Sequence, residues 1–213
     1  MTLDHYPATR AVLDALHAAA ARDARRWRDR TGTTDATVNA GGGGALVRLG
    51  EFYLAVSPDE GRLLYILARA IKAGRIVEFG ASYGISSLYL AAAARDNAGT
   101  LITTEVHPDK CAALRATFAA TELADAITLL EGDARETLRP VSGPIDMLFL
   151  DGWKSAYLPI FELLRPSLRA GALIVADNCT HAAAADYLAV VQSPASGCIT
   201  SVRDSIAISC VLP

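Results

Sequence analysis

Short apolar runs alternate with amphipathic segments from residue 46 to the C-terminus. Strand-favouring residues fill the runs, and apolar residues at helical spacing fill the segments between the first five, which indicates a parallel, doubly wound α/β sheet. No helix-length segment separates the last two runs, so we expect them to form an antiparallel hairpin. Before the first run, Ser57 and Pro58 are a typical helix start. The predicted strands span residues 75–79, 100–104, 126–130, 145–150, 172–176, 198–202 and 205–211.

The N-terminal part of the chain has a different pattern. Residues 9–30 carry alanine and leucine at helical spacing and end in an arginine-rich run around Trp27, which predicts one long helix. Residues 31–44 are small, polar and glycine-rich, as is typical of a flexible connection. We therefore expect residues 1–45 to form a helical cap with a mobile lid, and residues 46–213 to form the main domain.

The composition excludes several classes of protein. With 213 residues and 52% hydrophobic content, the chain has the size of one domain with a small appendage. A charged fraction of 20% and a net charge of −3 exclude a disordered acidic tail and a globally basic nucleic-acid binder. No apolar stretch approaches the ~20 residues that span a bilayer, and we find no secretory signal, so we expect no membrane partner. The four cysteines are scattered without a CxxC, which favours a cytoplasmic location over a disulfide framework.

In a doubly wound sheet the ligand binds at the carboxyl ends of the strands. The first such end carries Glu78 followed by Gly80 and Gly84, whose spacing differs from the GxGxxG of a dinucleotide site. An acid before a wide glycine turn suits a ligand with an ammonium group at this point. The second strand ends at Glu105, where an acid usually accepts ribose hydroxyls, and the third ends near Asp133, where adenine would lie. Together these strand ends predict a nucleoside ligand, whereas the glycines alone would indicate only a tight turn.

Oxygen donors follow the fourth and fifth predicted strands. Asp151 comes after the fourth strand, and Asp177 and Asn178 come after the fifth. Adjacent strand ends bring these three side chains together, and two carboxylates with one amide oxygen suit Mg²⁺. Lys154 lies at the same rim, where it is a candidate general base for deprotonating a hydroxyl. The alternative is structural: a salt bridge from Lys154 to either aspartate, with Asn178 capping the next helix.

Four motifs follow these strands in order: VEFGASYGISSLYLA (77–91), LITTEVHPDK (101–110), FLDGWKSAYLP (149–159) and ADN (176–178). With them, the chain from residue 54 onward resembles the class I S-adenosylmethionine-dependent methyltransferases. It is most similar to the metal-dependent O-methyltransferases, which include catechol and caffeoyl-CoA O-methyltransferases. The resemblance implies a seven-stranded sheet of order 3-2-1-4-5-7-6 with strand 7 antiparallel, in agreement with the predicted hairpin.

The resemblance also implies a role for individual residues. Lys154 matches the catalytic lysine, Trp153 matches an aromatic residue that lines the acceptor slot, and Arg135 lies near the adenine. The metal ligands are Asp151, Asp177 and Asn178. The residues that match the S-adenosylmethionine site are Val56, Glu78, Gly80, Ser82, Gly84, Ser86, Glu105, Val106, Asp133, Ala134 and Asp151.

The function implied is transfer of a methyl group to a hydroxyl of a small catechol-like or vicinal-diol acceptor held by a divalent metal. The chain departs from catechol O-methyltransferase at two substrate positions. An acid that binds the acceptor hydroxyl has no clear counterpart among Ser201, Arg203 and Asp204, and His181 and Ala182 stand where a gate proline is found. The chemistry therefore carries over from the family, and catechol as the particular acceptor does not.

Three alternatives remain open from the sequence. The first is a methyltransferase for a tRNA wobble-uridine hydroxyl, with the arginine-rich helix around Trp27 as the RNA-binding surface. The second is a cofactor-binding protein without turnover, which the intact Lys154 and metal-ligand set disfavour. The third is a nicotinamide-dependent oxidoreductase, which the absence of GxGxxG disfavours. The sequence also leaves open whether the chain forms a homodimer.

Overall fold

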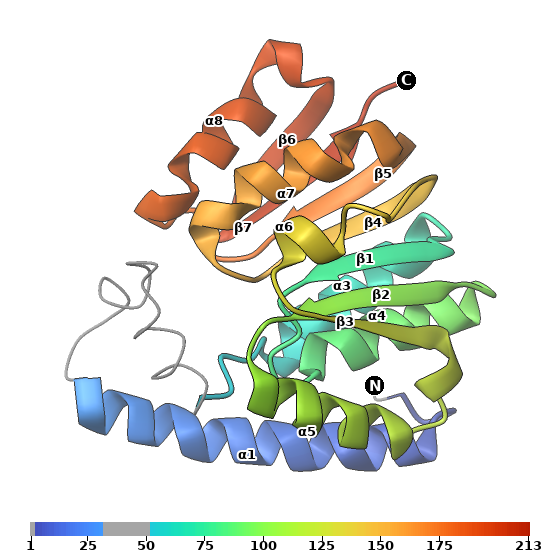
Figure 1. Cartoon of the computed structure of the whole chain (residues 1–213), viewed down its shortest axis with the longest axis vertical. Coiled ribbons are helices and arrows are strands. Elements are labelled where there is room, and N and C mark those ends of the chain that lie inside the picture. The colour runs from blue at the N-terminus through green and yellow to red at the C-terminus, as the bar shows by residue number, and fades with distance from the viewer. Residues whose placement is uncertain (1–2, 32–51) are drawn as a thin grey trace.

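A seven-stranded sheet forms the centre of the molecule (Figure 1). The computed structural model describes residues 3–31 and 52–213. The strands are β1 (Arg75–Phe79), β2 (Thr100–Glu105), β3 (Ile127–Glu131), β4 (Ile145–Leu150), β5 (Leu168–Ala176), β6 (Cys198–Arg203) and β7 (Ile206–Val211). Their order is β3-β2-β1-β4-β5-β7-β6, with β7 antiparallel to both of its neighbours and the other pairs parallel. The predicted doubly wound sheet and its terminal hairpin are confirmed.

Helices cover both faces of the sheet (Figure 1). The helices are α1 (Pro7–Thr31), α3 (Pro58–Ala70), α4 (Ile85–Asp96), α5 (Pro108–Ala119), α6 (Ala134–Thr137), α7 (Tyr157–Leu164) and α8 (Ala185–Gln192). Because side chains alternate along a strand, Ile76 and Met147 pack into the core under α3, α4 and α5, whereas Val77 and Leu148 pack into the core under α6, α7 and α8. In the described parts of the chain, none of the helices is long and apolar enough to cross a membrane.

The first turn of α3 has the capping contacts that its sequence predicts. The Ser57 hydroxyl accepts a hydrogen bond from the Glu60 amide at 3.2 Å, and the Glu60 carboxylate accepts one from the Ser57 amide at 2.6 Å. This reciprocal pair satisfies donors that the helix itself leaves unpaired. It also fixes where the preceding segment, residues 53–57, enters the domain.

The strand boundaries differ from the prediction mainly at β5. This strand begins at Leu168 rather than at residue 172, and the pairing register shifts after the Ile145–Leu168 pair. Asp146 lies at this irregularity, where it accepts hydrogen bonds from two backbone amides at the start of β1 and pairs with Arg169. The extra strand residues are therefore held by a polar side-chain contact, which hydrophobic patterning does not detect.

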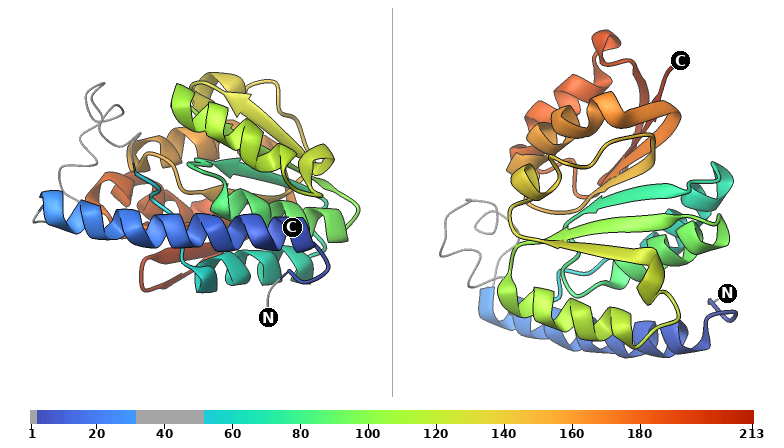
Figure 2. Two further views of the ribbon diagram at one scale, coloured as in Figure 1. Left: turned by 90° about the horizontal axis from the view of Figure 1, so that it is seen from below. Right: turned by 45° about the vertical axis from the view of Figure 1, so that its right-hand side comes forward.

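Helix α1 lies outside the helical layer and packs against α4 (Figure 2). Its first turn contains no acidic residue of its own. Glu122, between α5 and β3, instead accepts the backbone amides of Ala8 at 2.7 Å and Thr9 at 2.9 Å. The Tyr6 hydroxyl also donates to Asp96, at the end of α4, at 2.7 Å. These contacts attach the start of α1 to the domain at the edge opposite the carboxyl ends of the parallel strands.

The predicted helix over residues 9–30 is confirmed, with a slightly earlier start at Pro7. The predicted lid, residues 31–45, lies outside the described residues apart from Thr31, the last residue of α1. The proposed division of the chain at residue 45 therefore stays a prediction.

Candidate active site

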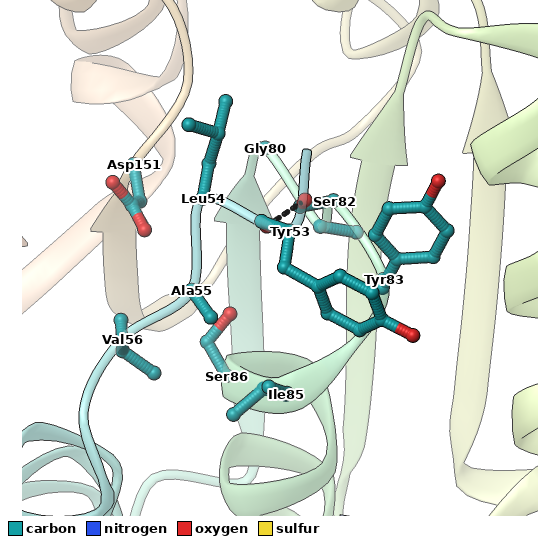
Figure 3. A pocket seen from close by; sticks show the side chains of 11 residues that line it. Tyr53, Leu54, Ala55, Val56, Gly80, Ser82, Tyr83, Ile85, Ser86 and Asp151 are labelled. Carbon is teal, nitrogen blue, oxygen red and sulfur yellow. Dashed lines mark hydrogen bonds between the residues drawn. The ribbon is translucent and has the colours of Figure 1, made fainter. Parts of the chain in front are cut away.

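The turn between β1 and α4 lines a pocket at the carboxyl edge of the sheet (Figure 3). Gly80 has a φ of +98°, and a Cβ atom there would lie 2.7 Å from the backbone of Gly152. This backbone approach and the left-handed conformation explain why the position needs glycine. The residues that line the pocket are Tyr53, Leu54, Ala55, Val56, Gly80, Ala81, Ser82, Tyr83, Ile85, Ser86 and Asp151.

Five of the predicted cofactor residues line this pocket: Val56, Gly80, Ser82, Ser86 and Asp151. The other predicted residues do not form its lining. Gly84 instead begins α4 in a left-handed conformation, with a φ of +92°. The sequence therefore located one wall of the pocket and Val56 of the opposite wall, and the structure adds Tyr53, Leu54 and Ala55 to that second wall.

Glu78 is completely buried between α4 and β2, away from the pocket lining. Its Oε2 atom accepts hydrogen bonds from the hydroxyls of Ser87 and Thr103, whereas its Oε1 atom has no described partner. Burial raises the pKa of this carboxyl, against the opposing effect of nearby hydroxyls. The Oε1 atom is thus a buried acceptor without a described partner, close in sequence to Gly80.

Glu105 connects the end of β2 to the glycine turn. Its Oε2 atom accepts the Ser82 amide at 2.9 Å, and its Oε1 atom accepts the amides of Val106 and His107 at 2.8 Å each. A carboxylate offers about four lone-pair sites, so these three bonds leave room for one more donor. The carboxylate of Glu105 is therefore held rigidly at the place where the sequence predicts a ribose reader.

Asp133 and Arg135 pair with each other at the next strand end. The Asp133 side chain caps the short helix α6 by accepting the Arg135 amide at 2.9 Å, and the two side chains form an ion pair. Hydrogen bonds from the Arg135 side chain are the main cause that lowers the pKa of Asp133. Ala134 is buried beside them. A hydrogen bond from the adenine amino group to Asp133 would have to share the carboxylate oxygens with this ion pair.

An acid–lysine–tyrosine cluster lies at the ends of β4 and β5. The Lys154 Nζ atom lies 3.2 Å from Asp151 Oδ1 and 2.7 Å from the Tyr157 hydroxyl, which in turn donates to the Asp177 carbonyl oxygen at 2.9 Å. Lys154 is only 8% exposed. The Asp151 amide donates to Phe79 in β1, so the backbone holds this aspartate beside the glycine turn. The structure thus brings the predicted acids and the predicted lysine together.

Burial dominates the electrostatics of this cluster. It raises the pKa of Asp151 to about 7, although the nearby Lys154 opposes the shift and Asp177 adds to it. Burial likewise raises the pKa of Asp177, again against Lys154. Two carboxylates thus share a single lysine cation.

The remaining predicted residues lie around this cluster. Trp153 is half-buried at the start of a short 3₁₀ turn, Lys154–Ala156. Asn178 is exposed and has a φ of +47°, next to Asp177. The Cys179 amide donates to the Ser205 carbonyl oxygen at 2.8 Å, which ties the loop after β5 to the turn of the last hairpin. His181 caps the turn that follows by accepting the Ala183 amide.

Sequence reasoning missed two buried residues of the site. Tyr157 stands out in the sequence only as part of a family motif, and its contact with Lys154 depends on how the chain turns into α7. Lys110, in α5, is 5% exposed and donates to the Ser82 hydroxyl at 3.0 Å. The sequence signal for Lys110 was its position shortly after the end of a strand, where site residues gather. A lysine near a helix start is usually exposed to solvent, so this position alone did not indicate a site residue.

Comparisons with known proteins agree with this geometry. A family model described as a methyltransferase domain matches residues 77–179. Catechol O-methyltransferase of Niastella koreensis is 33% identical over 138 residues, which cover 63% of this chain and 62% of the relative. The structure of cofactor-bound Rv0187 from MTB is 27% identical, with a TM-score of 0.66 over 89% of this chain and 96% of that one. TomG, an O-methyltransferase from Streptomyces achromogenes in complex with SAM, has a TM-score of 0.67 at 24% identity, over 91% of this chain and 96% of that one.

The seven-stranded sheet has the fold of the methyltransferase structures to which the chain is similar. Residues 77–179 match a methyltransferase domain, and the chain is similar to catechol O-methyltransferases. The chain spans about three fifths of the length of the first of these relatives, 62% and 57%. The activity, the acceptor and the metal are therefore matters for a proposal.

Proposed function

We propose that this protein transfers the methyl group of S-adenosylmethionine to one hydroxyl of a small catechol-like or vicinal-diol acceptor, with a divalent metal ion such as Mg²⁺ bound beside it. The observation that carries the proposal is the double role of Asp151, which lines the pocket of the glycine turn and also contacts Lys154. The methyl donor's pocket and the candidate base therefore share one residue. The relatives named as catechol O-methyltransferases support the acceptor class.

The pocket offers S-adenosylmethionine what its parts require. Glycine at position 80 lets the turn pack against the Gly152 backbone, and the buried Oε1 atom of Glu78, which has no described partner, would accept a hydrogen bond from a cationic group. Glu105 is held by three backbone amides and can accept one ribose hydroxyl. The neighbouring structures with bound cofactor and with SAM support the same assignment.

The charges at the ends of β4 and β5 fit a divalent cation. Asp151 and Asp177 are two buried carboxylates with one nearby cation, and burial raises the pKa of both, so each is costly to ionise as the cluster stands. A bound Mg²⁺ would offset that cost, and the oxygens of Asp151, Asp177 and Asn178 are donors that it prefers. When bound, the ion would lower the pKa of a coordinated acceptor hydroxyl.

Lys154 would take the hydroxyl proton. Tyr157 donates its own proton to the Asp177 carbonyl, so its oxygen accepts from Lys154, while Asp151 contacts the same nitrogen. These two contacts leave one direction of Nζ for the acceptor. When bound, S-adenosylmethionine would supply a methyl group on a sulfonium leaving group. Lys154, in its neutral form, would accept the acceptor's hydroxyl proton. Asp151 then stabilises the protonated lysine.

Chelation tests the proposal most directly. The full chain is dialysed against a chelator, and methyl transfer to a panel of catechols and aliphatic vicinal diols is measured with and without added Mg²⁺. We expect transfer to require the metal, whereas S-adenosylhomocysteine binding, measured by calorimetry, should persist without it. Asp177→Asn should lose about 10²-fold or more in rate, since it removes a charged donor. Asp186→Asn, at an exposed acid in the first turn of α8, is the matched control and should keep full activity.

Different parts of the proposal fail separately. Full activity after exhaustive chelation would remove the metal and leave the two aspartates as partners of Lys154. Binding of S-adenosylhomocysteine without turnover of any diol would refute the acceptor class. Bulk tRNA is assayed in parallel as an acceptor. We expect no methyl transfer to it, because the relatives are named as catechol O-methyltransferases and lend the tRNA alternative no support.

A further inference from the structure

The second wall of the cofactor pocket, residues 53–56, belongs to neither a helix nor a strand. It lies opposite the glycine turn and leads directly into the capped start of α3 (Figure 3). A segment of this kind has no ladder or helical hydrogen bonds to hold it. Its position therefore depends on contacts from other parts of the chain.

Two side chains hold the Tyr53 backbone from opposite directions. The Tyr53 amide donates to Oδ2 of Asp23, in α1, at 2.9 Å. The Tyr53 carbonyl oxygen accepts the hydroxyl proton of Ser82, in the glycine turn. Asp23 is only 6% exposed, so its hydrogen bond is shielded from water. Both polar backbone groups of Tyr53 are thus satisfied by side chains distant in sequence.

Lys110 sets the direction of the Ser82 bond. Its Nζ atom donates to the Ser82 oxygen at 3.0 Å, so the single hydroxyl proton of Ser82 is directed to Tyr53. The same Nζ lies 5.4 Å from the centre of the Tyr83 ring, and Tyr83 stacks on Tyr53 with a centroid distance of 4.3 Å. The wall is thereby attached to α5 as well as to α1.

This attachment supports a strained residue at the pocket. Leu54 follows Tyr53 directly, has a φ of +44°, and is 49% exposed while lining the pocket. A left-handed conformation is unfavourable for a residue with a Cβ atom, so it persists only where neighbouring contacts impose it. The two bonds to the Tyr53 peptide are the contacts that impose it here.

We propose that Asp23 is a positioning residue for cofactor binding. It acts through the Tyr53 backbone, by fixing residues 53–56 in the conformation that faces the glycine turn. Helix α1 therefore belongs to the cofactor site as well as to the outer surface of the fold. The inference rests on the proposed function only in that S-adenosylmethionine is the ligand of this pocket.

The test measures S-adenosylhomocysteine binding by calorimetry on the full chain. Asp23→Ala should raise the dissociation constant about 5- to 30-fold, the factor expected when a buried backbone donor loses its partner. Asp23→Asn keeps an oxygen that can accept the Tyr53 amide, so it should bind within about threefold of the wild type. This rescue by the conservative variant separates positioning of the backbone from a general effect of charge.

Glu122→Ala is the matched control, because it releases the other end of α1. It should lower the unfolding temperature and leave the dissociation constant unchanged. If Asp23→Ala does not fold, Lys110→Met tests the same wall from the α5 side. It should also weaken binding and speed hydrogen exchange at the amides of Leu54 and Ala55.

Two results would overturn the inference. One is a wild-type dissociation constant, within twofold, in Asp23→Ala, or in Lys110→Met where that variant replaces it. The other is a Glu122→Ala variant that weakens binding as much as Asp23→Ala. If the wild-type chain binds no S-adenosylhomocysteine at all, the proposed function fails first and the inference falls with it.

Discussion

The Nζ atom of Lys154 lies 2.7 Å from the hydroxyl oxygen of Tyr157, whose own proton goes to the Asp177 carbonyl oxygen. The tyrosine is thus an acceptor for the lysine and a link to the end of β5. With Asp151 at 3.2 Å on the same nitrogen, the lysine is held by two contacts in the buried cluster. Orientation of the base therefore depends on a residue that does not line the cofactor pocket.

Tyr157→Phe should slow methyl transfer while leaving the cofactor bound. The variant removes one of two contacts that direct Lys154 and leaves the Asp177 carbonyl without its donor. We expect turnover to fall roughly 10- to 100-fold, because misplacing a base costs less than deleting it. The free energy of unfolding should fall by about 1–2 kcal/mol. Steady-state kinetics, calorimetry with S-adenosylhomocysteine and urea unfolding measure the three quantities.

Tyr187→Phe provides the matched control for that variant. Tyr187 is equally buried, packs edge-on against the Tyr157 ring at 5.7 Å, and has no described hydrogen-bond partner for its hydroxyl. Removing this hydroxyl should change neither turnover nor stability by more than a small amount. Equal losses in both variants would mean that ring packing, and not the contact with Lys154, explains the effect.

Lys154→Ala should lower turnover about 10²- to 10⁴-fold at neutral pH, the usual effect of losing a positioned base. S-adenosylhomocysteine and metal binding should remain, since neither ligand depends on the lysine. The lost rate should return in part as the pH rises, because an acceptor that is already ionised needs no base. Rates measured from about pH 7 to pH 10, beside calorimetry, check both points. Near-normal turnover at neutral pH would reject the lysine as base.

Gly80→Ala should destabilise the protein and abolish cofactor binding. The new Cβ would meet the backbone of Gly152 at 2.7 Å, and the φ of +98° is unfavourable for alanine. We expect a loss of roughly 2–4 kcal/mol in the free energy of unfolding. Gly74→Ala is the control, since its Cβ would meet only Asp146 Oδ2 at 3.7 Å. That variant should be neutral or slightly stabilising, and a similar loss at both positions would contradict the steric argument.

Acid should release the start of α1. Desolvation works against ionised Glu122, but hydrogen bonds from the amides of Ala8 and Thr9 lower its pKa to about 2. Because the folded-state pKa of Glu122 lies below the ordinary value of about 4.3, ionised Glu122 stabilises the folded protein above that pH. This stabilisation is lost as the pH falls toward 2. Because the carboxylate is exposed, solvent limits this contribution to about 0.5–1 kcal/mol.

Glu122→Gln makes the acid dependence measurable. The difference in unfolding free energy between the wild type and this variant should be greatest near neutral pH and shrink between about pH 4.5 and about pH 2–3. Exchange of the Ala8 and Thr9 amides, followed by NMR, should quicken over the same range in the wild type alone. A difference that is independent of pH would show that ionisation of Glu122 contributes nothing.

The sheet was predictable because its strands are short, apolar and punctuated by turns. β1 and β4 have the predicted bounds, and the missing helix between the last two runs correctly indicated a hairpin. The start of β5 was not predictable, since Asp146 and Arg169 pair only when the strands are already side by side. Local patterning cannot report a contact that the assembled sheet creates.

The candidate site divides in the same way. Asp151, Lys154 and Asp177 follow strand ends, so topology alone brings them together, as predicted. Tyr157 shares a motif with Lys154, but the motif alone does not show that their side chains meet. Asp23 acts through a contact that requires α1 to be docked, and its partner Tyr53 lies far away in the sequence. Sequence reasoning therefore identified residues that follow strands and missed residues that hold them.

The hydrogen bond from the Cys179 amide to the Ser205 carbonyl oxygen lies in a different part of the site from the glycine turn. The sequences of these two parts can change independently. The pocket of the glycine turn is built from β1, α4 and residues 53–56, whereas this bond joins the loop after β5 to the turn between β6 and β7. An insertion or a new side chain in that hairpin turn would reshape the side of the site nearest Asp177 and leave the glycine turn intact. A change in this one surface turn can therefore alter the loop beside Asp177 without disturbing the pocket of the glycine turn.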